Sequence, residues 1–396
     1  MIAPEVISLD DKINVRFRLQ DLAAWQDAWK SQERYLDKLI EEIGNSPRAT
    51  DIQKAAEIAS LRNRLELQQV KVPLEIAPET IRAVGYNRLR RYLAAQFVPL
   101  TREERLLWLH NFLFLMTPDL RRLNDKIARI RAYRSFGQRR NFLLGGVSGM
   151  GKTTYLNWFT SNYIPQVERE RNHVPIIMID APEGNSPKPL FQRIIRACGT
   201  HYLERDTEEM LLMKISLFFQ RCGVEVLIID EVEHIKNHSV RRRLLEVSNM
   251  AHHVPIICAS CEPHRWIAGD SEIEGRWNDY FRLERYTGTK LQQLLAFLNL
   301  LLPFPQDSFL SPAPGKKATA EGESKRAAIA YVQQVTKGKL GNIMLLVREA
   351  SMAAIERNLP CLDEPLLRQT WGNIQTRPAK REQFGGEQRE TSGEEE

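Results

Sequence analysis

The sequence contains no apolar segment long enough to cross a membrane as a helix. Apolar runs such as Val226–Ile229 have the length of a strand, whereas a membrane-spanning helix needs roughly 20 consecutive apolar residues. The first residues also lack the basic and then apolar pattern of a signal peptide, so secretion is not expected. These two absences predict a cytoplasmic protein that makes no use of a membrane.

Cysteine is scarce, with five residues in a chain of 396. This number is too small for a disulfide framework and suits a reducing compartment. Cys258 and Cys261 have the spacing of half a metal site, but no second close Cys or Cys/His pair completes it, so we expect no zinc or redox role. The charge excess is modest, 56 Lys and Arg against 50 Asp and Glu, which permits nucleic-acid binding without requiring it.

The length predicts two or three domains, and the first part of the chain is expected to be mostly helical. It contains no catalytic constellation, so residues 1–116 are interpreted as a docking or assembly region, with a purely structural role as the alternative. Thr101 and Glu104 have the spacing of a capping box. The expected elements are a short strand over residues 13–19 and helices over 22–43, 50–70, 78–97 and 106–116.

A strongly basic helix is predicted next. Thr117 and Pro118 are typical of an N-cap followed by the first residue of a helix. Between Arg121 and Arg140, eight basic residues and one acidic residue give a net charge of +7. Such a segment is either a solvated helix face or a surface that faces the phosphates of a nucleotide or a nucleic acid.

From Phe142 onward, short apolar runs alternate with helical stretches, which predicts an α/β fold with a five-stranded parallel sheet. The expected strands are residues 142–145, 174–179, 224–229, 254–259 and 281–283. Helices are expected over 287–302 and 325–371, on either side of a proline-rich loop over 303–324. We therefore predict a core over residues 117–286, a small helical lid over 287–373 and a disordered tail over 374–396.

The segment Gly146–Thr153 matches the phosphate-binding motif G-x-x-x-x-G-K-[ST] at every fixed position, between a predicted strand and a predicted helix. Its glycines allow backbone N–H groups to surround phosphate oxygens, and the helix directs its positive end at the same anion. Lys152 is expected to bind the β- and γ-phosphates of ATP, and Thr153 to bind Mg²⁺. The predicted nucleotide-binding residues are Gly146, Ser148, Gly149, Met150, Gly151, Lys152, Thr153, Thr154 and Asp230.

Two acidic residues, Asp230 and Glu231, follow the apolar run Val226–Ile229. Ligands of open α/β sheets bind at the carboxyl ends of the strands. Asp230 is therefore expected to share the Mg²⁺ site with Thr153, and Glu231 to polarise the attacking water. The paired acids favour a hydrolysing ATPase over a nucleotide kinase, and the chain lacks the Asn-Lys-x-Asp motif of a GTPase.

Two further residues are candidates for catalysis. Ser260 ends the fourth predicted strand, where its hydroxyl would contact the γ-phosphate or the lytic water, or would serve only as a strand-end turn residue. Arg276 precedes the last strand, from where it would reach the γ-phosphate of a neighbouring subunit. Arg282 is the other candidate for that role. Alternatively, Arg276 is only a surface or salt-bridged arginine without a catalytic role.

With these parts in this order, the chain resembles the AAA+ ATPases, and more narrowly the TniB/TnsC family of transposition regulators, which includes CRISPR-associated forms. The resemblance covers about residues 118 to 356, or about 60% of the chain. It implies an AAA+ core with a helical N-terminal extension and a small helical lid. The segments that carry it are residues 139–154, 175–182, 227–235, 254–263 and 338–350.

The resemblance implies ATP-dependent assembly into rings or helical filaments around duplex DNA, in a bacterial cytoplasm and associated with the nucleoid. It also implies contacts with a transposase and with a target-selecting protein of the TniQ or TnsD type, and disassembly on hydrolysis. By motif position it assigns DNA contacts to Lys236 and Ser239, and more weakly to Lys188. Arg241 and Arg242 lie next to them and would add phosphate contacts. For each residue alone, a solvated surface side chain is the alternative.

Two departures from the family pattern bear on the candidate roles of Ser260 and Arg348. The turn after the fourth strand reads Ala-Ser-Cys-Glu-Pro over residues 259–263 where the family commonly has a Gly-Thr-Pro-like turn. The lid motif has no arginine directly after Gly341, so no second sensor role is assigned to Arg348.

The alternatives to a transposition regulator are an IstB-like or helicase-loader ATPase, and a signalling P-loop NTPase that does not bind DNA.

Overall fold

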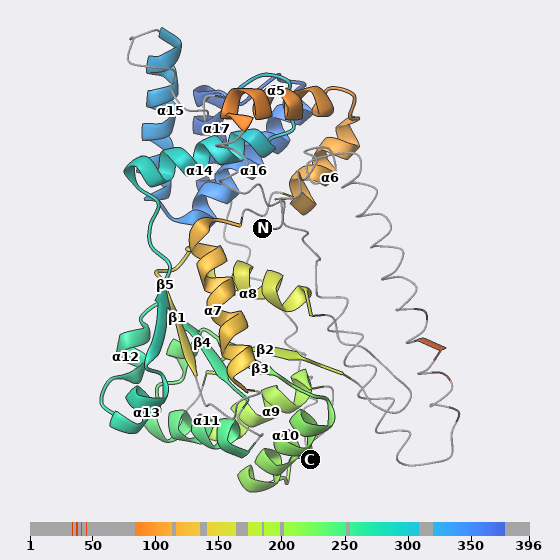
Figure 1. The fold of residues 1–396 in the computed structure, drawn as a ribbon, viewed down its shortest axis with the longest axis vertical. Coiled ribbons are helices and arrows are strands. Elements are labelled where there is room, and N and C mark those ends of the chain that lie inside the picture. Colours follow the sequence, from red (N-terminus) through yellow and green to blue (C-terminus); the bar gives the residue numbers. More distant parts are fainter. Residues whose placement is uncertain are drawn as a thin grey trace, which may run out of the picture.

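Five parallel strands form the centre of the structure, in the order β2-β3-β4-β1-β5. The computed structural model describes residues 84–112, 116–134, 141–163, 173–183, 186–198, 202–250, 254–308 and 320–376, and five isolated residues between 34 and 45 (Figure 1). The prediction of a five-stranded parallel sheet is confirmed. The strands are β1 (Phe142–Gly145), β2 (Ile176–Asp180), β3 (Val226–Asp230), β4 (Ile256–Ser260) and β5 (Asp279–Arg282).

Helices cover both faces of this sheet because its inner strands are apolar on both sides. In β1, Phe142 packs in one hydrophobic cluster and Leu143 in the other. The first cluster contains side chains of α7 (Pro118–Arg134) and α8 (Lys152–Ser161). The second contains those of α9 (Pro187–Ala197), α10 (Glu208–Arg221) and α11 (His238–Met250). Successive strand residues point to opposite faces, so continuous apolar runs become central strands.

Short helical elements follow β3 and β4, before the chain enters β5. They are the 3₁₀ turn η1 (Val232–His234) and the helices α12 (Pro263–Ile267) and α13 (Ser271–Arg276). Asp270 caps α13 by accepting the backbone N–H groups of Glu272 and Ile273. α12 and α13 connect the carboxyl end of β4 to the last strand, β5.

A helical layer lies beyond the sheet, at the top of Figure 1. It combines α14 (Gly288–Leu301), α15 (Ala320–Thr336), α16 (Leu340–Glu356) and α17 (Glu364–Thr376) with two helices from earlier in the chain, α5 (Tyr86–Phe97) and α6 (Arg102–Phe112). The indole N–H of Trp108 donates to the carbonyl of Leu301 at 2.8 Å. The capping box before α6 forms as predicted, since Thr101 and Glu104 exchange hydrogen bonds. The described end of the expected docking region therefore packs on the helices of the expected lid.

Several predicted boundaries are wrong. β2, β3 and β4 each begin two residues later than expected. Pro175 and Pro255 directly precede β2 and β4, and proline has no N–H for the sheet. β5 begins earlier, at Asp279. The predicted loop over 303–324 ends sooner because α15 begins at Ala320, and α17 extends past the predicted start of the tail to Thr376. The elements expected over 13–19 and 50–70 and the tail beyond residue 376 lie outside the described residues, and of the helix expected over 22–43 only residues 34, 37, 38 and 41 are described, all of them helical. Within the described part of the chain, no helix is long and apolar enough to cross a membrane.

Candidate nucleotide-binding site and nucleic-acid interface

The predicted phosphate-binding loop connects β1 to α8. Gly146, Gly149 and Gly151 have φ values of 151°, 82° and 87°, in a region that residues with a side chain rarely adopt. The loop can therefore curl tightly before it enters α8 at Lys152. This curl and the start of the helix are the geometry in which backbone N–H groups bind phosphate. All the predicted binding residues from Gly146 to Thr154 lie on this turn and on the first turn of α8.

Two side chains at the start of α8 have the contacts that a P-loop needs. The Nζ of Lys152 lies inside the loop, where it donates to the carbonyl of Gly146 at 2.6 Å. The hydroxyl of Thr153 donates to Oδ2 of Asp230 at 2.6 Å. A hydroxyl beside a carboxylate is a set of oxygen ligands that suits Mg²⁺. The structure thus brings together the two residues that the sequence assigned to the metal.

Asp230 and Glu231 are adjacent but lie in different surroundings. Asp230 is buried at the end of β3, and this burial raises the pKa of its carboxyl group, although the hydrogen bond from Thr153 opposes the shift. Glu231 is exposed and has a φ of 55°. A left-handed conformation is strained for a residue other than glycine, and such strain is concentrated at functional sites. The turn separates a buried ligand carboxylate from an exposed carboxylate that is free to face water.

The structure places Ser260 beside the P-loop, because it is the register partner of Gly145. Its side chain is fully buried, and its oxygen accepts the N–H of Glu262 at 3.1 Å. The Ser260 hydroxyl therefore stabilises the turn into α12, as the structural alternative expected. Its position at the P-loop edge also leaves it a candidate for contact with the nucleotide.

The two candidate arginine fingers lie at opposite ends of β5. Arg282 is the register partner of Gly145, so it lies at the P-loop edge of its own subunit. Arg276 ends α13 and precedes the start of β5, which pairs with Phe142 at the start of β1. It is half-buried, and no ion pair involves it among the described residues. This position separates Arg276 from its own P-loop, as a residue that acts on a neighbouring subunit requires.

Sequence analysis missed a contact between the lid and the P-loop. The N–H of Gly341, in the first turn of α16, donates to the carbonyl of Gly149 at 2.8 Å. Lys339 and Asn342 lie close to Gly149 as well. The signal in the sequence was the pair of glycines at 338 and 341, because only glycine permits such a close approach of two backbones. Arg348 lies further along α16, where burial lowers its pKa.

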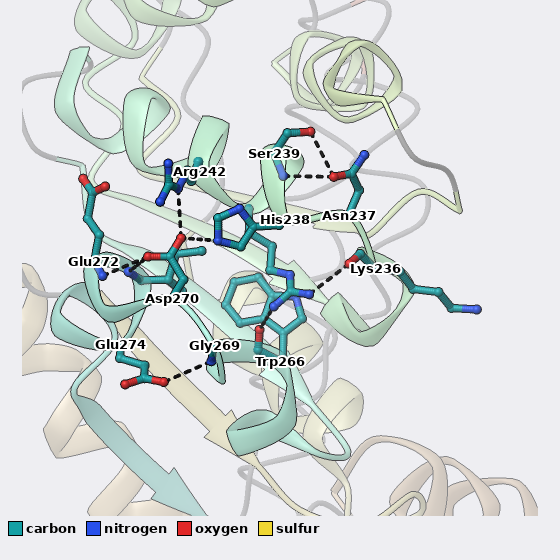
Figure 2. Close-up of polar contacts among 12 residues, drawn as sticks. Lys236, Asn237, His238, Ser239, Arg242, Trp266, Gly269, Asp270, Glu272 and Glu274 are labelled. Atoms are coloured by element: carbon teal, nitrogen blue, oxygen red, sulfur yellow. Dashed lines mark hydrogen bonds and ion pairs between the residues drawn. The ribbon is translucent and has the colours of Figure 1, made fainter.

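Four of the five predicted DNA contacts lie at or just before the start of α11, and Figure 2 shows three of them, Lys236, Ser239 and Arg242. Lys236 is exposed, and its side chain extends away from the contacts drawn there. The others form internal hydrogen bonds: Ser239 with Asn237, Arg241 with the carbonyls of Lys236 and Trp266, and Arg242 with Asp270. Lys188, on α9, donates to the carbonyl of Glu204 at 2.6 Å.

The basic helix α7 uses several of its charges within the molecule. Arg131 forms an ion pair with Glu225, and Lys126 forms one with Asp279. Arg122 pairs with Asp119 on the same helix. The first two ion pairs attach α7 to the sheet, a role that neither the predicted solvated face nor the predicted phosphate-facing surface includes.

Among the residues that the structure describes, no group of three or more His, Cys, Asp or Glu side chains could hold a metal ion. Cys258 is buried in β4, and burial raises the pKa of its thiol. Cys261 lies by the P-loop, where its sulfur accepts a hydrogen bond from Lys152 at 3.4 Å.

The strand order, the curled loop after β1 and the Thr153–Asp230 contact define a P-loop α/β fold of the AAA+ type, as predicted. Residues 105–287 match the sequence model of the family described as Bacterial TniB protein. The expected resemblance to TniB is therefore confirmed over the segment that contains the whole ATPase core.

The solved structures to which the chain is similar are distant in sequence. The ORC2 protein of Aeropyrum pernix, in ADPNP–ADP complexes, is 14% identical with a TM-score of 0.45, over 63% of this chain and 66% of that one. The RuvB Holliday junction branch migration motor of Thermotoga maritima is 15% identical with a TM-score of 0.39, over 64% and 69%. The Aeropyrum pernix ORC1 protein in complex with DNA is 13% identical with a TM-score of 0.43, over 72% and 69%. The matched regions span about two thirds of the length of these structures. No curated protein matches the sequence.

Proposed function

We propose that this protein is an ATP-dependent regulator of transposition that assembles on duplex DNA and links a target-selecting protein to the transposase. The observation that carries the proposal is the TniB match over residues 105–287, because this one segment includes both the P-loop and the exposed loop at Lys236. The fold alone does not identify the biological role, since one fold serves many functions.

The site residues suggest how ATP is bound and cleaved. Backbone N–H groups of the P-loop and the ammonium of Lys152 would bind the β- and γ-phosphates. Thr153 and Asp230 would hold Mg²⁺, which neutralises phosphate charge when bound. Glu231 would orient and polarise the water, and Ser260 would contact the γ-phosphate side of the site.

ATP would lie between subunits, with Arg276 of one copy directed at the γ-phosphate of the next. An arginine supplied in this way stabilises the charge that develops in the transition state. Nucleotide shared by two subunits favours the assembled state, and hydrolysis removes that preference. Assembly and release then follow from the different affinity of the two states for ATP.

Lys236 is the strongest candidate for a contact with DNA. Its ammonium is exposed, and its backbone is held by Arg241, which donates to the Lys236 carbonyl at 2.9 Å. Ser239, Arg242 and, from α9, Lys188 would add weaker contacts. Contacts of this kind bind the phosphate backbone and position the protein without reading sequence, which suits a protein that coats DNA.

A salt titration of duplex binding in a slowly hydrolysed ATP analogue tests this function. The logarithm of the binding constant should fall linearly with the logarithm of salt concentration, by about 0.9 for each neutralised phosphate. Lys236→Ala should lower that slope by about 0.9, whereas Arg88→Ala, an exposed arginine on α5, should leave it unchanged. No duplex binding at low salt with the analogue would contradict the proposal and favour a signalling switch. Co-purification with a replicative helicase in place of a transposase would favour a loader.

A further inference from the structure

One buried carboxylate, Asp270, joins two helices that carry different candidate functions (Figure 2). Its side chain is only 2% exposed. Oδ1 accepts the backbone N–H groups of Glu272 at 2.9 Å and Ile273 at 3.3 Å, so this oxygen caps α13. Oδ2 accepts Nε of Arg242 at 2.9 Å and also contacts Nε2 of His238, both on α11. Each oxygen therefore serves one helix.

The two helices connect the candidate DNA loop to the candidate arginine finger. α11 begins two residues after Lys236, and α13 ends at Arg276. A second contact connects the candidate DNA loop to the region of α12, because the guanidinium of Arg241 donates to the carbonyls of both Lys236 and Trp266. The Trp266 ring packs edge-on against Trp277, the residue after Arg276, with centroids 5.4 Å apart.

The contacts of Asp270 are strong compared with the intrinsic stability of the short helix α13 that they hold in place. The hydrogen bond from Arg242 lowers the pKa of Asp270 to about 2, so the carboxylate is charged at neutral pH. Hydrogen bonds between charged partners are about twice as strong as neutral ones. A helix of six residues such as α13 has little stability of its own, so its position depends on its cap and its packing.

We propose that Asp270 is a positioning residue that transmits contact with duplex DNA at Lys236 to Arg276, and so makes ATP hydrolysis in the neighbouring subunit depend on DNA. This inference rests on the function proposed above. Duplex bound at Lys236 would fix the start of α11, Asp270 would carry that position to α13, and α13 would set the reach of Arg276.

Asp270→Asn tests the contact with α11 separately from the cap of α13. The variant keeps one acceptor oxygen to cap α13, while its NH₂ group faces the donors of Arg242 and His238. We expect duplex binding and DNA-free hydrolysis to remain at the wild-type level. Stimulation of hydrolysis by duplex should fall at least about tenfold, a part of the 10³ or more that an arginine finger can contribute.

Two more variants complete the test. His238→Phe removes one donor from α11 without touching the cap, so it should lower stimulation even if Asp270→Asn does not fold. Glu274→Gln is the matched control, because Glu274 lies on α13 and accepts only the N–H of Gly269 among the contacts drawn in Figure 2; its stimulation should be normal. Adding Glu231→Gln subunits, which bind ATP without hydrolysing it and retain an intact Arg276, should restore stimulation to Asp270→Asn subunits.

The outcomes separate this inference from the proposed function. Normal stimulation in folded Asp270→Asn and His238→Phe, with wild type stimulated by DNA, would overturn the coupling and leave the proposed function intact. Loss of duplex binding in Asp270→Asn would also overturn it, because Asp270 would then act on the DNA loop alone. A wild-type protein that does not bind duplex would overturn both.

Discussion

At the scale of single residues, Asp230 and Glu231 show how adjacent carboxylates acquire different roles. Burial and the contact with Thr153 make Asp230 a candidate ligand, and a left-handed backbone leaves Glu231 exposed. Paired acids in different environments often divide catalytic work in this way. Each assignment can be tested by the matching amide.

Glu231→Gln should slow ATP hydrolysis by about 10² to 10⁴, the usual contribution of a positioned acid or base. ATP binding should persist, because Lys152 and Thr153 are untouched, so the variant should accumulate in the ATP-bound assembly. Phosphate release and nucleotide binding, measured side by side, check both parts. Glu262→Gln, which alters an exposed acid after β4, serves as the control, and normal turnover in Glu231→Gln would show that another residue activates water.

Asp230→Asn should change how stability depends on pH. Burial raises the pKa of Asp230, so the folded state disfavours the charged form and loses stability as pH rises through that pKa. Asparagine does not ionise, so the free energy of unfolding of the variant should increase relative to that of the wild type as the pH rises above about 4. Denaturant unfolding without nucleotide measures this. Asp125→Asn, on the exposed side of α7, should show no such gain.

Individual residues were predictable where a local motif defines their chemistry. The order of glycines and Lys152 predicted the P-loop. The role of Asp230 was predicted because acidic residues directly follow the apolar run Val226–Ile229. Asp270, Lys339 and Asn342 were not predicted, because their partners lie on other helices and no local spacing reports a contact between elements. The internal hydrogen bonds of Arg241 and Arg242 were missed for the same reason.

At the scale of elements, the lid reaches the nucleotide site through a backbone contact. Gly341 lies so close to Gly149 that an added Cβ would come within 2.9 Å of the Gly149 carbonyl oxygen. Gly338 is equally confined, since its Cβ would lie 2.4 Å from the carbonyl oxygen of Tyr286. Gly341 therefore allows the start of α16 to lie against the P-loop, and Gly338 allows the segment before it to lie against Tyr286.

Gly341→Ala should push α16 away from the P-loop and weaken nucleotide binding, because neither backbone can yield without moving an element. Gly372→Ala, in the interior of α17, has open space around the added methyl group. It should instead raise the free energy of unfolding by about 0.5–1 kcal/mol through helix propensity. Nucleotide titration and thermal unfolding of both variants give the comparison. Equal nucleotide affinity in the two would contradict a role for the lid contact.

The elements themselves were predicted better than their ends. Apolar runs predicted all five strands because buried parallel strands are apolar on both faces. The same runs placed the starts of β2 and β4 too early, since Val174 and Val254 are buried outside the sheet ladder. An apolar residue in the sequence indicates burial, whereas the start of a strand depends on hydrogen bonds to the neighbouring strand.

At the scale of the whole molecule, Arg90 fastens α5 to the segment that follows α14. Its side chain is 4% exposed and forms an ion pair with Asp307 at 2.8 Å. It also donates to the carbonyls of Phe304 and Gln306, at 2.9 and 2.6 Å. A contact across more than two hundred positions cannot be predicted from local pattern, so the division at residue 116 remains a prediction.

Arg90→Met should lower the free energy of unfolding by about 1–3 kcal/mol, because it leaves buried carbonyls without donors. The apolar stem of methionine retains most of the packing. Arg88→Met, two residues away on the exposed face of the same helix, should change stability little. Denaturant unfolding of both variants measures the difference, and equal stability would show that α5 is held by other contacts.

The central claim is that ATP joins copies of this chain around duplex DNA. Electron microscopy of the protein with duplex DNA and a slowly hydrolysed ATP analogue tests it most directly. We predict rings or continuous threads of protein on the DNA with the analogue, and bare DNA when ADP replaces it. Protein that remains monomeric when both the analogue and duplex are saturating would contradict the account.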